Sequence, residues 1–172
     1  MWPFQKKQEI FLTNTLSGNK EVFVPIRRSE VRMYSCGPTV YGPQHVGNLR
    51  AAVFSDLVAR TVLSAGYKVK RVTNITDVGH MVGDGDDGED KMSVGAKLEK
   101  KTPKEIADRY AKQYIADIHA LNIDISTIRF PRATDYIQDQ IEMIQTLEKK
   151  GLAYQADDGV YFDTEKFPNY GV

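Results

Sequence analysis

Residues 34–48 read Y-S-C-G-P-T-V-Y-G-P-Q-H-V-G-N and contain the side chains of this sequence that are best suited to bind a phosphate. His45 and Asn48 each offer a hydrogen-bond donor, and Gly47, which has no Cβ, lets a ligand approach the backbone closely. If a helix begins here, its unpaired N–H groups and partial positive charge also favour an anion. The structural alternative is a loop histidine followed by an asparagine that caps the helix.

Cys36 is the only cysteine of the chain and ends an apolar run. A thiolate between a strand end and a helix start can act as a nucleophile or as a metal ligand, whereas a single cysteine is most often a small buried hydrophobic residue. A nucleophile needs a base within reach, and His45 is the histidine nearest to Cys36 in the sequence. A closed zinc site needs about four ligands, which this one cysteine and the scattered His45, His80 and His119 cannot supply.

The elements around this segment are predicted to form a βαβ unit. We expect a buried strand over Val31–Ser35, a helix over Asn48–Ala65 and a second strand over Val69–Thr73. A strand, a glycine-bearing loop, a helix and a strand in this order imply an α/β fold with a parallel sheet and a right-handed crossover. Open parallel sheets bind ligands at the carboxyl ends of their strands, where residues 34–48 lie. The apolar face predicted for the helix consists of Phe54, Leu57, Val58, Thr61, Val62 and Ala65.

Elements are also predicted before and after this unit. Two short strands, Glu9–Asn14 and Glu21–Val24, flank the turn-rich Ser17–Asn19. A second long helix is predicted to begin after Thr102, which forms a capping box with Glu105. The residues predicted for its core stripe are Ile106, Tyr110, Tyr114, Ile118 and Leu121.

The last part of the chain is predicted to contain a helix and a hairpin. The helix spans about Thr134–Lys149, with Ile137, Ile141, Ile144 and Leu147 on one face. Apolar residues then alternate on both sides of Asp158-Gly159, a dipeptide that favours a type I′ turn.

The composition of the chain narrows its possible partners. Among its 172 residues, 23 basic and 23 acidic side chains cancel, so no overall field attracts nucleic acid or an anionic membrane. Any contact with RNA must then be local, or made by another part of the protein. A single cysteine excludes an internal disulfide framework and suits a reducing cytoplasm. The sequence has no apolar run of signal-peptide or membrane-span length, so we expect a cytoplasmic protein that does not contact a membrane.

Together, these motifs resemble the amino-terminal part of the catalytic domain of cysteinyl-tRNA synthetases, which are class I aminoacyl-tRNA synthetases. M-Y-S-C-G-P-T-V-Y-G-P-Q-H-V-G-N is followed by V-T-N-I-T-D-V, and H-V-G-N is similar to the family's HIGH signature with asparagine in the last place. P-R-A-T, K-G-L-A-Y, G-V-Y-F-D and F-P-N-Y-G-V follow in the family's order. The resemblance implies a Rossmann-like (HUP-type) parallel sheet with flanking helices, plus a small C-terminal β-hairpin.

The family's chemistry gives these residues specific roles. The resemblance implies a cysteine–tRNA ligase, which uses ATP (with Mg) to convert L-cysteine to cysteinyl-adenylate and transfers the cysteinyl group to tRNA(Cys). His45 and Asn48 would be the catalytic residues that hydrogen-bond the ATP phosphates, and Gly47 would let the nucleotide pack against the backbone. Cys36 would be one zinc ligand, with the thiolate of the substrate at an open coordination position. The cysteine pocket would be lined by Gly37, Thr39 and Thr76.

The resemblance spans nearly the whole chain but only the first half of the family's catalytic domain. It assigns residues 1–30 to N-terminal strands, 31–125 to the first half of the nucleotide-binding fold and 126–172 to the start of the connective insertion. The family's other zinc ligands, its K-M-S-K-S loop and its tRNA-binding helices lie in its second half. We therefore expect that this chain alone is inactive, and that tRNA(Cys) binds through the missing C-terminal part.

Two segments between residues 80 and 101 are assigned no catalytic role. Lys91-Met92-Ser93 superficially matches the K-M-S-K-S loop but continues V-G-A, so we interpret it as a helix start. His80 and the acidic residues 84–90 are interpreted as a surface loop. Calcium is rejected because, counting from Asp84, the fifth, sixth and twelfth positions lack the residues that an EF-hand needs.

Two other functions stay open from the sequence. A cysteine ligase of mycothiol biosynthesis uses the same adenylation but passes cysteine to an amino sugar, and the residues quoted above hardly separate it from the tRNA ligase. A non-catalytic synthetase-like paralogue that binds a nucleotide or a partner protein is the other candidate. An open reading frame beyond codon 172 that supplies the missing motifs would favour an enzyme.

Overall fold

The computed structural model describes residues 9–79, 102–168 and 170–171 of the chain. His80, the acidic residues 84–90 and Lys91-Met92-Ser93 lie outside these residues, so their predicted roles stay predictions. The chain forms two compact units, Met1–Arg132 and Ala133–Val172. No helix among the described residues combines the length and the apolar character that crossing a membrane requires.

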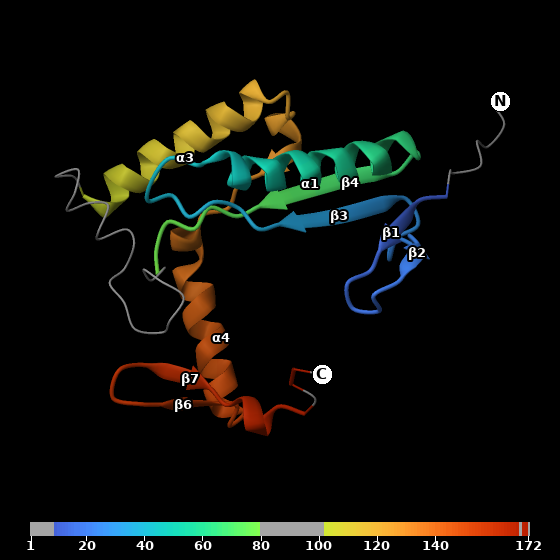
Figure 1. The fold of residues 1–172 in the computed structure, drawn as a ribbon. Coiled ribbons are helices and arrows are strands. Elements are labelled where there is room, and N and C mark those ends of the chain that lie inside the picture. The colour runs from blue at the N-terminus through green and yellow to red at the C-terminus, as the bar shows by residue number, and fades with distance from the viewer. Residues whose placement is uncertain (1–8, 80–101, 169, 172) are drawn as a thin grey trace. The chain divides into compact units, whose positions relative to one another are not determined.

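The first unit is built on the predicted βαβ arrangement. Its three-stranded sheet has the order β3 (Glu30–Ser35), β4 (Lys68–Thr73), β5 (Ile128–Arg129), and both strand pairs are parallel. Helix α1 (Val46–Ser64) joins β3 to β4, and α3 (Pro103–Ala120) lies on the same side of the sheet as α1 (Figure 1). The predicted α/β fold with a parallel sheet is therefore confirmed.

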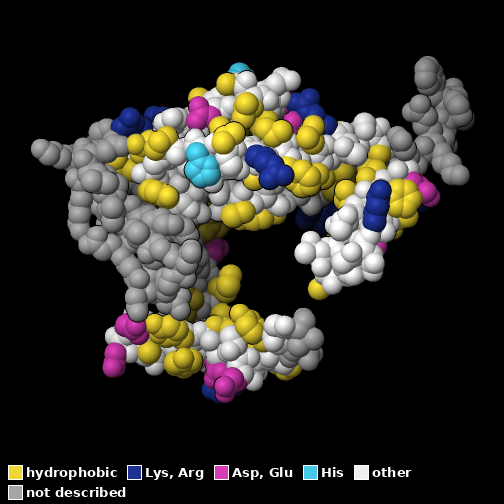
Figure 2. Space-filling model, viewed as in Figure 1, with side chains coloured by type: hydrophobic (Ala, Val, Ile, Leu, Met, Phe, Trp, Pro, Cys, Tyr) yellow, Lys and Arg dark blue, Asp and Glu magenta, His cyan; other side chains and the backbone are white. Residues whose placement is uncertain are grey.

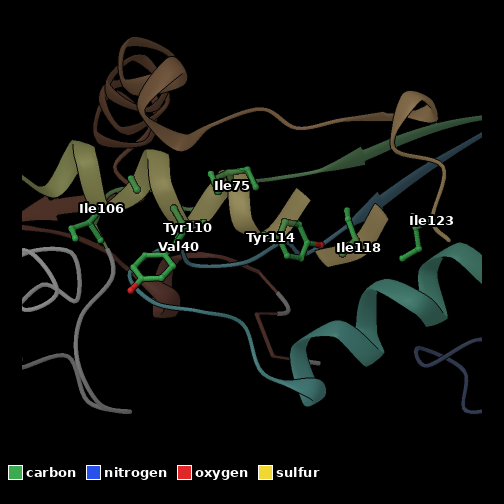
Figure 3. Close-up of a cluster of buried hydrophobic side chains, with 9 residues drawn as sticks. Val40, Ile75, Ile106, Tyr110, Tyr114, Ile118 and Ile123 are labelled. Atoms are coloured by element: carbon green, nitrogen blue, oxygen red, sulfur yellow. The ribbon is translucent and has the colours of Figure 1, made fainter. Parts of the chain in front are cut away.

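Helix α3 supplies most of the larger hydrophobic core. Thr102 caps it and exchanges hydrogen bonds with Glu105 as predicted. Four of its five predicted core residues are buried, but Leu121 is 45% exposed, because it stands at the C-cap where the helix ends. Figure 3 shows the buried side chains of the helix directed to one side. They pack with residues of the loops after β3, β4 and α3 in a cluster of Val40, Ile75, Ile106, Ala107, Tyr110, Ala111, Tyr114, Ile118 and Ile123.

Helix α1 packs on the sheet through a face that overlaps only in part with the one predicted. Val62 and Ala65 are buried and Val58 is partly buried, but Phe54 and Leu57 are 68% and 57% exposed. The buried side also includes Ala59 and Asp56, and Asp56 forms an ion pair with Arg71 of β4. Figure 2 shows hydrophobic side chains exposed along the first unit, and among those exposed on α1 are Val46, Phe54, Leu57 and Leu63.

Strand β3 is less buried than predicted. Val31 is buried and packs with α1, whereas Tyr34 is 70% exposed. Successive side chains of a strand point to opposite faces, and within the described part of the first unit both long helices cover one face of the sheet (Figure 1). Residues of β3 that point to the other face are therefore exposed.

The predicted pair of N-terminal strands is present in shorter form. β1 (Phe11–Thr13) and β2 (Lys20–Val22) pair antiparallel, with Phe11 opposite Val22. Ile10, just before β1, joins a second core cluster with Val31 of β3 and Val62 and Ala65 of α1.

The second unit contains a helix and a hairpin. α4 (Ile137–Lys149) follows the 3-10 turn η2 (Ala133–Tyr136), and β6 (Ala153–Gln155) pairs antiparallel with β7 (Val160–Phe162). The hairpin is confirmed, but the type I′ turn at Asp158-Gly159 is wrong. The N–H of Ala156 donates to the carbonyl of Gly159 (2.8 Å), which places Asp157 and Asp158 at the tip. A type I′ turn needs positive φ at both central residues, and Asn122 is the only described non-glycine residue with positive φ.

The remaining elements are short 3-10 turns. η1 (Ile125–Thr127) leads into β5, and η3 (Thr164–Lys166) follows β7.

Candidate functional site

A cleft of about 400 Å³ opens at the carboxyl end of β3, beside the first turns of α1. Gln44 stabilises the loop that lines the cleft, because the side-chain amide of Gln44 donates to the carbonyls of Thr39 and Gly42 (3.3 Å each). Tyr114 of α3 completes the lining from the core side. The lining residues that the sequence singled out are Cys36, Gly37, Thr39, His45 and Asn48.

Cys36 is exposed to this cleft and is not the buried hydrophobic residue that base rates favour. Its Sγ makes a weak contact with the carbonyl oxygen of Gly37 at 3.9 Å. The thiol therefore lies in the same cleft as His45 and Asn48. Among the described residues, however, no group of three or more histidine, cysteine or acidic side chains is placed to hold a metal ion. Cys36 fits the chemistry of a zinc ligand, but the described residues do not form a zinc site around it.

The start of α1 is held by a reciprocal cap between His45 and Asn48. His45 is the N-cap residue: its Nδ1 accepts the N–H of Gly47 (3.1 Å), and its own N–H donates to Oδ1 of Asn48 (3.3 Å). The helix thus begins at Val46, two residues before the predicted start, and His45 rather than Asn48 caps it. Because Nδ1 is an acceptor, the proton of a neutral imidazole is on Nε2. Nε2 of His45 and Nδ2 of Asn48 are then the donors available to a ligand.

Gly47 is needed by the cap itself. A Cβ at this position would lie 2.9 Å from Cε1 and 3.0 Å from Nδ1 of His45, closer than side chains pack. Gly47 does not line the main cleft but a shallower hollow with Arg50, Ala51 and Phe54. Gly47 is exposed, so a ligand can approach its backbone. The His45 ring also leaves too little room for a Cβ at this position.

Thr76 does not line the cleft but lies directly beside residues that do. The Thr76 N–H donates to the carbonyl of Pro38, and the Val40 N–H donates to the carbonyl of Thr76, both at 3.0 Å. These bonds form a parallel bridge between Thr39 and Thr76. The two threonines singled out in the sequence are therefore neighbours across the loops that follow β3 and β4.

Asn74 is a site neighbour that the sequence analysis did not single out. Its Oδ1 accepts the N–H of Gly37 (2.9 Å), and its Nδ2 donates to Oγ1 of Thr76 (3.1 Å). The motif N-I-T-D contained this residue, but nothing in the sequence showed that its side chain would reach the loop after β3.

A buried ion pair anchors α1 next to the site. Asp56 and Arg71 are 6% and 7% exposed, and Nη1 of Arg71 lies 2.6 Å from Oδ1 of Asp56. Arg60 binds the other carboxylate oxygen at 2.6 Å. Burial alone would raise the pKa of Asp56, but hydrogen bonds from Arg60 and Arg71 outweigh it and hold the pKa below its ordinary value. The sequence did not reveal this pair, because a charged residue on a helix is usually exposed.

These features define an α/β protein with a parallel sheet, a cleft at the carboxyl end of its first strand and a helix start beside that cleft, which is where open parallel sheets bind their ligands. The chain belongs to the family described as "tRNA synthetases class I (C) catalytic domain", which matches residues 22–172.

Similar proteins with known names point to one kind of synthetase. The chain is 48% identical over 160 residues to cysteine–tRNA ligase 1 of Burkholderia lata, covering 93% of this chain and 34% of that protein. It is 44% identical over 167 residues to the cysteine–tRNA ligase of Deinococcus radiodurans, covering 97% of this chain and 33% of that protein. The chain thus spans about a third of the length of these relatives.

Solved structures of other class I synthetases share the fold. An Agrobacterium radiobacter K84 LeuRS, in a ternary complex with tRNA and LeuAMS, matches with a TM-score of 0.60 at 19% identity, covering 78% of this chain and 16% of that one. Arginyl-tRNA synthetase from Plasmodium falciparum matches with a TM-score of 0.52 at 16% identity, covering 82% and 30%. At these identities the comparison supports the architecture only.

Proposed function

We propose that this chain carries the amino-terminal part of the active site of a cysteine–tRNA ligase. The observation that carries the proposal is the single cleft in which an exposed thiol, Cys36, lies together with the His45–Asn48 cap of a long helix. The relatives named cysteine–tRNA ligase support it. The activity belongs to a protein of the relatives' length, and this chain would contribute part of its site.

The start of α1 is proposed to bind the phosphates of ATP, which enters with Mg. Backbone N–H groups and the helix dipole favour an anion there. Nε2 of His45 and Nδ2 of Asn48 add two side-chain donors. When the carboxylate of L-cysteine attacks the α-phosphorus, a new P–O bond forms, the bond to the bridging oxygen breaks and pyrophosphate leaves. These donors would stabilise the negative charge as it shifts, so positioning and electrostatics supply the catalysis.

The loops after β3 and β4 are proposed to bind L-cysteine. Gly37 and Thr39 line the cleft, and Thr76 pairs with Thr39 through the backbone. Cys36 would be one ligand of a zinc ion, and the other ligands must come from outside the described residues. Zinc, when bound, would select the thiolate of cysteine over the hydroxyl of serine, because soft thiolates are the better zinc ligands. Packing alone separates such near-isosteres poorly.

Transfer to tRNA(Cys) is proposed to depend on parts of the protein beyond this chain. We therefore expect no cysteine-dependent exchange of pyrophosphate into ATP by the 172-residue chain alone. A cytoplasmic location stays a prediction from the single cysteine.

Ligand titrations of the isotopically labelled chain test the two subsites separately. Adding ATP with Mg²⁺ is expected to shift the amide resonances of Gly47 and Asn48 at the start of α1. In a protein of the relatives' length, which would supply the other zinc ligands, adding L-cysteine with Zn²⁺ is expected to shift those of Gly37 and Thr39, and L-serine is the matched control ligand. Cys36→Ala should remove the preference for cysteine over serine while leaving the ATP shifts in place. Millimolar ATP that leaves the start of α1 unperturbed, or equal responses to cysteine and serine, would contradict the proposal.

A further inference from the structure

Asn74 is the side chain that connects the two loops of the proposed cysteine site. It follows β4 and is partly buried. Its Oδ1 accepts the N–H of Gly37 at 2.9 Å, and its Nδ2 donates to the hydroxyl of Thr76 at 3.1 Å. Gly37 directly follows Cys36, so one amide group links the peptide beside the thiol to the threonine proposed for the pocket.

The backbones of the two loops are in close contact at this point. A Cβ on Gly37 would lie 1.7 Å from the carbonyl oxygen of Asn74 and 2.8 Å from its carbonyl carbon, so no other residue fits without moving the loops apart. The pairing of β3 with β4 continues beyond the strands through the hydrogen bonds that join Thr76 to Pro38 and Val40. The Gly37 N–H also belongs to this continued ladder, but its acceptor is the side-chain oxygen of Asn74 and not a backbone carbonyl.

We propose that Asn74 is a positioning residue that holds the Cys36–Gly37 peptide and the Thr76 hydroxyl in one fixed relation. Shortening the side chain to alanine leaves the Gly37 N–H and the Thr76 hydroxyl without their partner, while the backbone bonds on both sides remain. The loop that carries Cys36 then loses the hydrogen bond between the Gly37 N–H and Asn74, which lies next to the thiol. The relevance of Asn74 to cysteine binding rests on the proposed function, but the effect of Asn74 on the loop of Cys36 can be measured without any ligand.

The test compares Asn74→Ala with Asn74→Asp in the 172-residue chain. Loss of one hydrogen bond is expected to make the Gly37 amide exchange with solvent roughly tenfold faster in Asn74→Ala. The amides of Val40 and Thr76, which are bonded to backbone carbonyls, should keep their protection. Reaction of the single thiol with 5,5′-dithiobis(2-nitrobenzoate) should become roughly several-fold faster, because the loop that carries Cys36 opens more often. Asn74→Asp should restore both values, because an ionised carboxylate can accept from Gly37 and from the Thr76 hydroxyl.

Asn14→Ala is the matched control, because Asn14 also makes two side-chain hydrogen bonds, to the Leu16 N–H and to Glu21, in the turn between β1 and β2. It should change neither Gly37 exchange nor thiol reactivity. Unchanged Gly37 exchange in Asn74→Ala would overturn the proposal. Equal acceleration at Gly37, Val40 and Thr76 would overturn it too, because Asn74 would then contribute only to general stability.

Titration with L-cysteine and Zn²⁺ distinguishes failure of this proposal from failure of the proposed function. If an unmodified protein of the relatives' length gives no shifts with L-cysteine and Zn²⁺, the assignment of the pocket fails, whereas the exchange and thiol measurements on the 172-residue chain still decide the role of Asn74. If that longer protein responds to L-cysteine and its Asn74→Ala variant responds equally well, the positioning role is overturned and the pocket stands.

Discussion

At His45 the helix cap uses one ring nitrogen and leaves the other for the proposed contact with ATP. Nδ1 accepts the N–H of Gly47 and caps α1, so Nε2 is not used by the cap. The sequence presented capping and phosphate binding as alternatives for this tetrapeptide. The geometry makes them compatible, because the cap fixes the ring that offers the second donor.

Gly47→Ala is predicted to separate stability from ligand binding. The new Cβ would contact the His45 ring at 2.9–3.0 Å and displace it. Alanine improves the helix by up to about 1 kcal/mol, while loss of a cap costs about 1 kcal/mol. The free energy of unfolding, measured by urea titration, should therefore change by less than about 1 kcal/mol. The ATP-induced shifts at the start of α1 should be lost or strongly reduced.

His45→Asn is the control for this prediction. Asparagine is a good N-cap, so the variant should keep the helix start while removing the Nε2 donor. Weak ATP binding in both variants would assign the effect to the imidazole. Normal ATP binding in Gly47→Ala would show that the position of the ring is not important.

At the scale of the element, α1 is attached to the sheet by charge as well as by apolar contact. The apolar face predicted from periodicity included Phe54 and Leu57, yet the buried side contains Asp56, paired with Arg71 of β4. Periodicity counts apolar residues and cannot show that a carboxylate has a guanidinium beneath it. The ion pair therefore lies on the side of the helix that faces the sheet, together with apolar residues of both clusters.

Asp56→Asn is predicted to lower the free energy of unfolding at pH 7 by roughly 3–5 kcal/mol, because it leaves Arg71 buried without its charge partner. The effect should depend on pH. The pKa of Asp56 in the folded protein is below its unfolded value of about 3.9, so the pair stabilises the fold above that pH. This stability is lost as the pH falls through the folded pKa, and the wild-type and variant curves should converge there.

Urea unfolding between pH 7 and pH 2 measures this convergence. Asp108→Asn is the comparison, because Asp108 pairs with Lys104 and Arg132 at a more exposed position. An exposed pair contributes roughly 1 kcal/mol or less. Similar losses in the two variants would mean that the Asp56–Arg71 pair is not the anchor of α1.

At the scale of the whole molecule, the two compact units differ in how they are stabilised. Both clusters of buried hydrophobic residues lie between Ile10 and Phe130 in the first unit. Among the described residues of the second unit none is buried. Its contacts include the stacked rings of Tyr154 and Tyr161, with centroids 5.9 Å apart, and the tilted pair Phe162 and Phe167 at 5.8 Å. The first unit therefore holds the cores on which the candidate site is built.

Residues 1–132 are predicted to fold without residues 133–172. A protein cut after Arg132 should unfold cooperatively in urea and keep the amide shifts of Gly37 and Gly47, because both cores are complete within it. A peptide of residues 133–172 should show no cooperative transition, since a lone helix and a two-stranded hairpin are marginal in water. Loss of the folded state in the shorter protein, seen by circular dichroism, would contradict this division.

The sequence by itself determined the order of the elements and which candidate side chains lie near the strand ends. The βαβ unit, the Thr102–Glu105 cap and the C-terminal hairpin follow from local signals: periodicity, capping residues and alternation. The thiol, the histidine and the asparagine were expected at the carboxyl ends of the strands, and Cys36, His45 and Asn48 line one cleft there.

Only the tertiary structure decided which residues meet across the chain. The Asp56–Arg71 pair, the contact of Asn74 with Gly37 and the buried side of α1 all join positions that are distant in sequence or lie on different elements. The predicted type I′ turn failed at closer range, because the register that pairs Gln155 with Val160 placed Asp157 and Asp158 at the tip. Local patterns fix a residue's own conformation, whereas its partners depend on packing, which brings together groups that no sequence window contains.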